Sequence, residues 1–293
     1  MPNGEVIARP FLTINKRLHG VKMLLGNLKK MRVTLKTPVQ YELILGEHII
    51  PLNDLIGRQV TLCYQGEIHC IHCGRKTKKS FNQGYCYPCT QKLAECDICI
   101  VRPEKCHFAQ GTCRDNEWAE MNCFIPHIVY LANTSGLKVG ITRGTQIPTR
   151  WIDQGATQAL PIFKTVTRFQ VGLIEKALST FVADKTNWRN MLKGNAENVD
   201  LKAEGEKLIA KANESITKIT KENEVGAIIP FTETASVEIS YPVLQFPQKI
   251  VSHNFDKNSE VCGVLKGIKG QYLIFDSGVI NIRKFAGYMV SLA

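Results

Sequence analysis

The sequence lacks any long apolar run. No stretch of its 293 residues approaches the ~18 consecutive apolar residues that span a bilayer. The first residues, MPNGEVIARPFLTINKRLHG, contain no apolar segment followed by a small-residue cleavage site, so we expect no secretory signal. These absences predict a cytoplasmic chain with no membrane partner. Thiols stay reduced in that compartment, so clustered cysteines indicate metal ligands rather than disulfides.

Cysteine is almost absent outside one segment. Of the 11 cysteines, ten lie between Cys63 and Cys123, and only Cys262 lies elsewhere. This segment has few large apolar side chains, so it cannot bury enough surface to fold on hydrophobic packing alone. Metal binding can supply the missing folding free energy. We therefore expect metal ions in a structural role.

The first half of this segment, CIHCGRKTKKSFNQGYCYPC, predicts a zinc site. It contains two CxxC pairs, Cys70 with Cys73 and Cys86 with Cys89, separated by twelve residues. Each CxxC turn lets two thiolates reach one ion, and two such turns supply the four ligands of a tetrahedral Zn²⁺. Disulfides or a redox CxxC are the alternatives, and the paired spacing disfavours both.

The second half, CDICIVRPEKCHFAQGTC, predicts another four-thiolate site. Its candidate ligands are Cys96, Cys99, Cys106 and Cys113. The set is ambiguous, because His107 or Cys123 could replace one member. Four thiolates also suit an iron–sulfur cluster, but two structural zinc ions are the simpler interpretation.

Acidic residues are outnumbered by basic ones. The chain has 37 Lys and Arg against 26 Asp and Glu, a net charge of +11. The excess is uneven, because residues 126–195 carry nine basic and three acidic residues. A basic region of this kind favours a polyanionic partner, most often nucleic acid. A solvated basic surface without a partner is the alternative.

Two distant stretches resemble each other. HIIPLNDLIGRQVTL (48–62) and GVINIRKFAGYMVSL (278–292) have equal length and share Ile, Gly, Val and Leu at four matching positions. Upstream, Gln40-Tyr41 matches Gln271-Tyr272, and GNLKKM echoes GVLKGI. We infer an internal duplication of two β modules that pack as one small barrel or sandwich. Chance similarity between β-rich stretches is the alternative.

A third stretch, IVYLANTSGLKVGITR (128–143), predicts a β-hairpin. Its two apolar runs lie on either side of a turn-forming cluster at 133–136. Side chains alternate across a strand, so one face is expected to hold Val129, Leu131, Leu137, Val139 and Ile141.

The opposite face of this hairpin carries the polar residues. It is expected to present Tyr130, Lys138 and Gly140 on one surface. The register that keeps both apolar sets together favours pairing Leu131 with Leu137 and Tyr130 with Lys138.

The remaining pattern completes an α+β chain. After the hairpin we expect a short helix at 149–154, a strand at 162–168, a helix at 169–182 and a polar helix at 201–224. The predicted organisation is an N-terminal β module (1–69), a zinc-binding segment (70–125), an α/β domain (126–200), a connecting helix (201–235) and a C-terminal β module (236–293).

Four features of the α/β domain together form a recognisable pattern: Tyr130, the KVGIT stretch (138–142), Arg150 and Glu175. In this order they resemble the GIY-YIG nuclease superfamily over roughly residues 127–192. The whole chain, with its QGYCYPC and CDICIVRPE stretches, also resembles a bacterial zinc-binding family of unknown function. The departures are a first motif without its usual glycine and Lys138 in place of the second tyrosine.

The resemblance implies a role for each of these residues. Glu175 would bind one divalent cation, Mg²⁺ or Mn²⁺, and Arg150 would neutralise the scissile phosphate. Tyr130 would orient or deprotonate the attacking water. Lys138 would join this catalytic set, and Gly140 and Thr142 would adjoin the phosphate. Phosphodiester hydrolysis needs charge neutralisation and an activated water, which one metal ion and one arginine largely provide.

Three functions follow as hypotheses. The first is a nucleic-acid-binding protein, for DNA or RNA, with metal-dependent phosphodiester hydrolysis of the GIY-YIG type. The second is a non-catalytic nucleic-acid-binding module that uses the same basic surface. The third is a zinc-stabilised scaffold whose β modules bind a protein partner.

Overall fold

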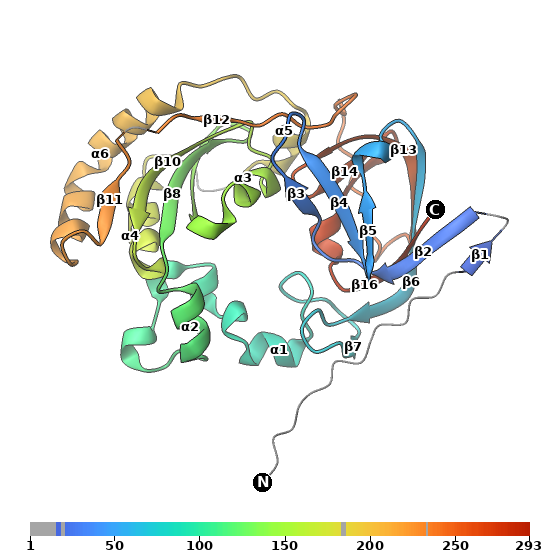
Figure 1. The fold of residues 1–293 in the computed structure, drawn as a ribbon, viewed down its shortest axis with the longest axis horizontal. Coiled ribbons are helices and arrows are strands. Elements are labelled where there is room, and N and C mark those ends of the chain that lie inside the picture. The colour runs from blue at the N-terminus through green and yellow to red at the C-terminus, as the bar shows by residue number, and fades with distance from the viewer. Residues whose placement is uncertain (1–15, 19–20, 183–185, 233) are drawn as a thin grey trace, which may run out of the picture.

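The computed structural model describes residues 16–18, 21–182, 186–232 and 234–293 (Figure 1). These residues form three antiparallel sheets of eight, five and three strands together with six α-helices. The predicted α+β fold class is therefore confirmed. No helix among the described residues is long and apolar enough to cross a membrane.

The eight-stranded and three-stranded sheets form one β unit with strands from both ends of the chain. The long sheet runs in the order β1-β2-β16-β6-β13-β14-β15, with β7 beside β6. Its strands are β1 (Lys16–Leu18), β2 (Val21–Asn27), β6 (Gln59–His69), β7 (Lys76–Thr77), β13 (Glu260–Lys269), β14 (Tyr272–Phe275), β15 (Gly278–Asn281) and β16 (Tyr288–Leu292). The small sheet contains β3 (Arg32–Thr34), β4 (Gln40–Leu45) and β5 (His48–Pro51).

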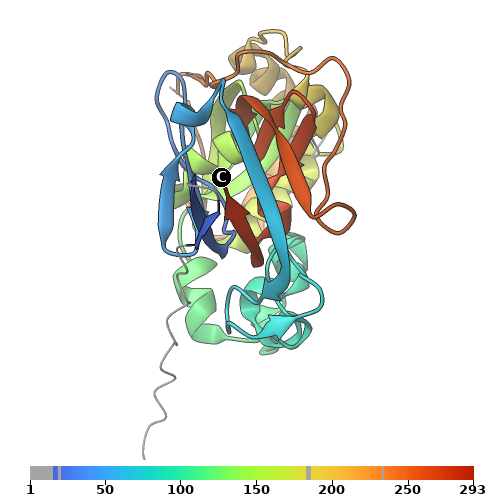
Figure 2. The same cartoon turned by 90° about the vertical axis from the view of Figure 1, so that its right-hand side faces the viewer.

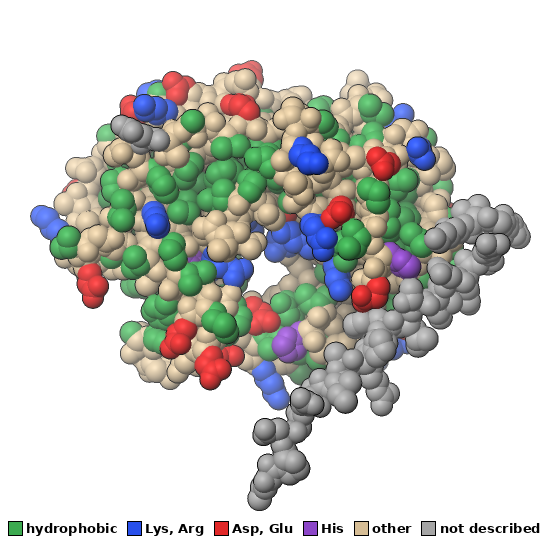
Figure 3. Space-filling view, viewed as in Figure 1, with side chains coloured by type: hydrophobic (Ala, Val, Ile, Leu, Met, Phe, Trp, Pro, Cys, Tyr) green, Lys and Arg blue, Asp and Glu red, His purple; other side chains and the backbone are tan. Residues whose placement is uncertain are grey.

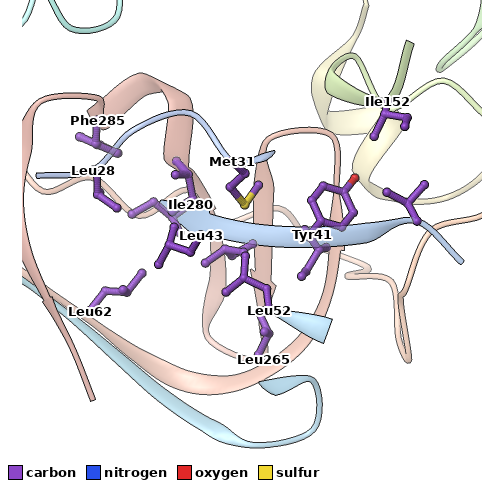
Figure 4. Packing of buried hydrophobic residues seen from close by; sticks show 14 of the residues in the cluster. Leu28, Met31, Tyr41, Leu43, Leu52, Leu62, Ile152, Leu265, Ile280 and Phe285 are labelled. Carbon is purple, nitrogen blue, oxygen red and sulfur yellow. The ribbon is translucent and has the colours of Figure 1, made fainter. Parts of the chain in front are cut away.

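Apolar side chains from both sheets fill the interior of the β unit. Tyr41 and Leu43 of β4 meet Leu62 of β6 and Leu265 of β13, and all four are buried (Figure 4). Burial of this kind stabilises a fold by about 25 cal/mol for each Å² of apolar surface removed from water. Ile152, from outside the β unit, joins the same cluster and so connects this core to the next domain.

The two similar stretches occupy equivalent places in the β unit. Residues 48–62 and 278–292 each form a strand, a 3₁₀ turn and the start or whole of a second strand. Their second strands, β6 and β16, pair antiparallel, and Leu62 lies opposite its own counterpart, Leu292. The two stretches are therefore related by an approximate two-fold axis near this pair.

The backbone hydrogen bonds repeat about the same axis. The Gly57 N–H donates to the Leu265 carbonyl, and the Gly287 N–H donates to the Leu28 carbonyl, both at 2.8 Å. Gly57 and Gly287 have φ angles of +86° and +89°, a conformation that residues with a Cβ rarely adopt. The matching glycines thus mark one turn that is used twice.

One part of the expected alignment is shifted by one residue. The Leu52 N–H donates to the Tyr41 carbonyl, and the Ile282 N–H donates to the Gln271 carbonyl, both at 2.9 Å. Tyr41 therefore corresponds to Gln271 and not to Tyr272. Sequence identity alone aligned Tyr41 with Tyr272, whereas the backbone hydrogen bonds align Tyr41 with Gln271.

The five-stranded sheet forms an α/β unit beside the β unit. Its order is β11-β10-β8-β9, with β12 also beside β10. The strands are β8 (His127–Asn133), β9 (Leu137–Arg143), β10 (Gln158–Thr165), β11 (Ile228–Pro230) and β12 (Val237–Glu238). Helices α4 (Arg168–Leu178) and α6 (Leu201–Lys221) cover its outer face, and α3 (Thr149–Asp153) lies on the side of the β unit (Figure 1). A short helix, α5 (Trp188–Leu192), precedes α6.

The predicted elements of the α/β unit are present with adjusted limits. The strand expected at 162–168 is β10, which begins earlier because Gln158 pairs with Asn133 of β8. It ends before 168 because Thr167 and Gln170 form a capping box that starts α4. The polar helix is α6, and its expected apolar face is buried at Leu208, Ala212 and Ile216.

The hairpin is present, but its predicted register was wrong. Tyr130 lies opposite Gly140, and Leu131 lies opposite Val139, so the pairing is displaced by two residues. Asn133 still belongs to the strand, because a three-residue turn ending at Gly136, with φ +137°, closes the hairpin. The predicted faces are correct: the apolar side chains pack beneath α4 and α6.

The cysteine segment lies below both units and connects them (Figures 1 and 2). It contains two short helices, α1 (Tyr87–Lys92) and α2 (Asn116–Asn122), and a series of 3₁₀ turns. The long strand β6 leads down into it from the β unit. The segment leaves through α2 and runs directly into β8.

Candidate metal centre and basic opening

The first cysteine cluster has the geometry of a zinc site. The Sγ atoms of Cys70, Cys73, Cys86 and Cys89 all lie within 4.8 Å of one another. The Cys73 and Cys86 Sγ atoms are 3.8 Å apart. Four thiolates at about 2.3 Å from a tetrahedral Zn²⁺ stand at about this separation. The two predicted CxxC pairs therefore do meet, and their donor set fits one zinc ion.

Local turns bring these four thiols together. The Gly74 N–H donates to the Cys70 carbonyl at 2.9 Å, and Gly74 has a φ of +70°, so the first CxxC closes as a tight turn. Cys86 lies at the N-cap of α1, which places Cys89 in the first turn of that helix. Burial would raise the pKa of the Cys70 thiol, but hydrogen bonds from three backbone N–H groups outweigh it and bring the pKa to about 7.

The second predicted ligand set is only partly assembled. Cys99, Cys106 and Cys113 line one small cavity of about 20 Å³, and Cys123 lines it with them. Cys96 instead lines a separate, larger cavity. Cys96 ends the 3₁₀ turn at Ala94–Cys96, and Cys99 lies in the next one, at Ile98–Ile100, so the two thiols of this CxxC line different cavities. The CxxC spacing alone does not indicate this division.

Asp97, Cys99 and His107 also place ligand-type atoms within 4.8 Å of one another. The Asp97 carboxylate accepts from the Cys99 N–H at 3.2 Å, from His107 Nε2 at 3.2 Å and from Arg114 Nε at 2.6 Å. His107 Nδ1 bonds the Thr112 hydroxyl at 2.8 Å. Burial raises the pKa of Asp97, but these partners outweigh it and hold that pKa below its ordinary value.

Three of the residues singled out in the α/β unit lie near one another. The Tyr130 hydroxyl bonds the Gln154 side chain at 2.9 Å. With the Gln154 amide turned to satisfy both neighbours, its oxygen accepts from Arg150 at 3.2 Å. Burial raises the pKa of Tyr130 to about 12, although Arg150 beside the hydroxyl lowers it, and the carboxylate of Glu175 adds to the rise. Tyr130 and Arg150 are thus in contact, with Glu175 in electrostatic reach.

The other predicted site residues, Gly140, Thr142 and Lys138, are buried as well. A Cβ at Gly140 would lie 2.7 Å from the Tyr130 ring, so the glycine lets this ring pack directly against β9. Thr142 is buried on β9. Lys138 is also buried, and its Nζ lies 3.4 Å from the Thr186 hydroxyl, near the tip of the hairpin.

A family model decides where this chain belongs. The model described as "Protein of unknown function (DUF2797)" matches residues 57–290. The chain belongs to this family. No curated protein and no solved structure matches the chain. The DUF2797 match includes both cysteine groups and the Tyr130–Arg150 contact, and it names no activity for them.

This DUF2797 chain has a basic opening at its centre. Figure 3 shows the opening between the cysteine segment and the two units above it, with Lys and Arg side chains on its rim. A cavity of about 750 Å³ lies here, and its basic lining residues are Lys29, Lys30, Arg32 and Arg283. No acidic side chain is among the described residues that line it. Thr149 of α3 and Tyr85 of the cysteine segment are also among its lining residues.

The basic opening continues into a second cavity on the cysteine segment. This cavity of about 690 Å³ shares Tyr85 and Arg283 with the first and adds Phe81 and Tyr87. The Arg283 guanidinium is in electrostatic reach of Arg150, which connects the opening to the Tyr130–Arg150 contact. The two cavities together form a path lined by guanidinium, ammonium and aromatic groups, with the carboxylates of Glu95 and Asp97 also on the wall of the second cavity.

Sequence reasoning did not identify the basic residues of the opening. The most basic segment was 126–195, but the β unit supplies the four cations, from the Lys29–Arg32 run and from Arg283. The LKKMR run (28–32) could have indicated this site, because it places three basic residues in and next to the connection between β2 and β3. Its partner, Arg283, is distant in sequence and meets it only because the β unit joins both ends of the chain.

Proposed function

We propose that the chain binds nucleic acid in the basic opening. The supporting observation is the cavity of about 750 Å³ with four basic side chains and no acidic side chain among its described lining residues. Phosphate contacts from Lys and Arg supply most of the sequence-independent affinity for nucleic acid. Lys30 pairs with the buried Asp153, whereas Arg32 makes only an exposed 3.4 Å ion pair with Glu42, which solvent screens. Lys29, Arg32 and Arg283 are therefore the main candidates for phosphate contacts.

The aromatic residues favour a single strand. Tyr85, Phe81 and Tyr87 line the continuation of the path, where unpaired bases could stack on their rings. Base–aromatic stacking contributes about 1–3 kcal/mol per base and tolerates any sequence. A duplex offers no free base faces to such a wall. The proposed ligand is therefore single-stranded DNA or RNA, bound without strong sequence preference.

Phosphodiester hydrolysis is a second candidate function, supported by the Tyr130–Arg150 contact. Arg150 would bind the scissile phosphate, and Glu175 would bind a divalent cation, as the GIY-YIG resemblance implies. Tyr130 is buried and its pKa is raised to about 12, so it keeps its proton at neutral pH. Its role in this proposal is to position Arg150 and Gln154, and the metal-bound water would be the nucleophile.

Binding is tested with fluorescent single-stranded oligonucleotides over a range of salt concentrations. With three to four phosphate contacts, log K should fall with log[salt] at a slope of about −2 to −3. The Lys29→Gln/Arg32→Gln double variant should bind at least about tenfold more weakly and lose about one unit of slope. Both residues are exposed, so the variant should fold normally.

Lys211→Gln, an exposed lysine on α6, is the matched control and should bind like the wild type. Equal affinity of the wild type and the double variant would overturn the assignment of the opening. For hydrolysis, cleavage with Mg²⁺ or Mn²⁺ should disappear in Glu175→Gln and persist in Glu206→Gln. Cleavage that survives in Glu175→Gln would exclude the proposed cation site.

A further inference from the structure

We propose that Gln83 contacts the edge of one base of the bound single strand, and that this base is adenine. The inference rests on the proposed function, because it names a nucleotide that the basic opening holds. Gln83 lies in the loop between the two cysteine pairs of the zinc site, and it lines both cavities of the path. It therefore stands where the cations of the first cavity meet the aromatic rings of the second.

The loop that holds Gln83 is a closed turn with an unusual backbone. Phe81 and Tyr85 exchange backbone hydrogen bonds, both at 2.8 Å, and the three residues between them have φ angles of +43°, +65° and +137°. The third is Gly84, for which a positive φ carries no steric cost. The first two, Asn82 and Gln83, are the only residues other than glycine with a positive φ in the part of the chain that the structure describes.

Glycine would form this turn at a lower steric cost, so the two side chains need an explanation. Asparagine tolerates the left-handed conformation, and the Asn82 side chain hydrogen-bonds the Cys96 thiol. Glutamine has no such tolerance, and Gln83 is exposed and forms no hydrogen bond with any described residue. Residues held in such conformations cluster at ligand-binding sites. The Gln83 side chain therefore serves a ligand rather than the fold.

The charges of the two cavities orient the strand. The first cavity has four basic and no acidic side chains among its described lining residues, whereas the second has two of each. Phosphates should therefore lie in the first cavity, with the bases directed toward the second. Tyr85 lines both cavities and belongs to the same turn as Gln83. In the proposed complex, one base stacks on the Tyr85 ring and its edge meets the Gln83 amide.

An amide suits a base edge better than a phosphate. It offers one acceptor and two donors, whereas a phosphate has only acceptors and is already served by the cations of the opening. Unpaired bases present their edges to such groups. The characteristic pairing of glutamine is bidentate, with N6 and N7 of adenine, and it discriminates between bases about tenfold. Adenine is therefore the expected base, at one position of a strand that is otherwise bound without regard to sequence.

The test measures binding of short fluorescent oligothymidine strands, unsubstituted or with one central adenine, cytosine or guanine. The wild type should bind the adenine strand about tenfold more tightly than the others. Gln83→Gly should lose this preference and keep its affinity for unsubstituted oligothymidine, and it should fold normally because glycine readily adopts a φ of +65°. Gln83→Glu should bind every strand more weakly and prefer cytosine, whose N4 donates to a carboxylate.

Gln248→Gly is the matched control and should keep the adenine preference, because Gln248 is exposed at a different cavity. Equal binding of all strands by the wild type, or an adenine preference that survives in Gln83→Gly, would overturn this inference. A preference for another base would overturn the assignment of adenine. In each of these cases the proposed function still stands if the Lys29→Gln/Arg32→Gln variant binds more weakly. Binding that ignores those two cations would overturn the proposed function and this inference together.

Discussion

The two cysteine groups differ in how their thiols are brought together. In the first, two short turns each contribute two thiols, and Gly74 and the start of α1 are enough to aim them at one point. In the second, four turns contribute one thiol each, and Arg168 of the neighbouring unit anchors the segment. The first geometry is local, whereas the second depends on the α/β unit.

This difference explains why spacing alone predicted how the first group assembles but not that Cys96 lines a different cavity from Cys99, Cys106 and Cys113. A CxxC turn predicts a ligand pair only when both thiols point to the same side, as at Cys70 and Cys73. Cys96 and Cys99 have the same spacing, but a 3₁₀ turn ends at Cys96 and a new one begins after Asp97. The pair is therefore divided between two cavities.

The largest effect should follow loss of a first-group ligand. Cys86→Ser should release the zinc and with it most of the roughly 10 kcal/mol that such a site contributes to local folding. Residues 70–92 should then exchange their amide hydrogens rapidly, while 97–123 stay protected by their contact with α4. Binding of single strands should weaken too, since Tyr85 lies in this region. Hydrogen exchange by mass spectrometry, with a zinc assay, measures the change.

Cys63→Ser is the control for this experiment, because Cys63 lies on β6 outside both groups. It should retain zinc and the wild-type exchange pattern. If residues 97–123 lose protection together with 70–92 in Cys86→Ser, the two groups fold as one unit and the proposed independence is wrong.

Much of the fold was predictable because its signals are local. The alternation in the hairpin, the cap residues of α4 and the apolar spacing of α6 each act within a few residues. The hairpin register was wrong because Ala132 and Asn133 carry no strong strand signal, yet Asn133 pairs with Leu137 and Gln158. Such pairings form between separate segments, and a local pattern does not contain them.

The residues of the candidate sites also differ in whether the sequence could identify them. Tyr130 and Arg150 were identified because their order along the chain resembles a known family, and they lie in contact. Whether Tyr130 would be exposed was not predictable, because α3 and the β unit bury it. Lys29 and Arg283 were missed for the same reason: they become neighbours only through a sheet that joins both ends of the chain.

A smaller effect is expected from protonation of His127, which lies where the second cysteine region enters β8. Burial lowers the pKa of His127 to about 4, below the ordinary 6.5, while its Nδ1 bonds the Ile125 carbonyl at 2.7 Å. The unfolded chain therefore binds more protons between pH 6.5 and 4, and stability is lost as pH falls through this range. Full protonation should cost about 3 kcal/mol.

Urea unfolding at pH values from 7.5 to 5, with zinc in excess, measures this loss. His127→Asn keeps a donor near the Ile125 carbonyl and cannot titrate, so its stability should change less with pH than that of the wild type. If the free energy of unfolding falls equally with pH in both proteins, protonation of His127 is not the cause of the acid destabilisation.

The smallest effect concerns the contact between the second cysteine region and α4. Gly172 lies on α4, where a Cβ would come within 2.5 Å of Pro103 and 2.8 Å of the Glu104 backbone nitrogen. A glycine-to-alanine change inside a helix usually gains about 1 kcal/mol. Here the overlap with backbone should cost about 1–3 kcal/mol, so that Gly172→Ala is destabilised by about 1 kcal/mol overall.

Gly205→Ala on α6 is the matched control, because the nearest atom to its Cβ is a flexible Leu131 methyl at 3.3 Å. That variant should be neutral or slightly stabilised in urea unfolding. Gly172→Ala should also increase hydrogen exchange at residues 97–106 and leave 70–92 unchanged, because only the second region rests on α4. Equal stabilities of the two alanine variants would mean that this contact does not hold the second region in place, and the contrast with the self-contained zinc site would then fail.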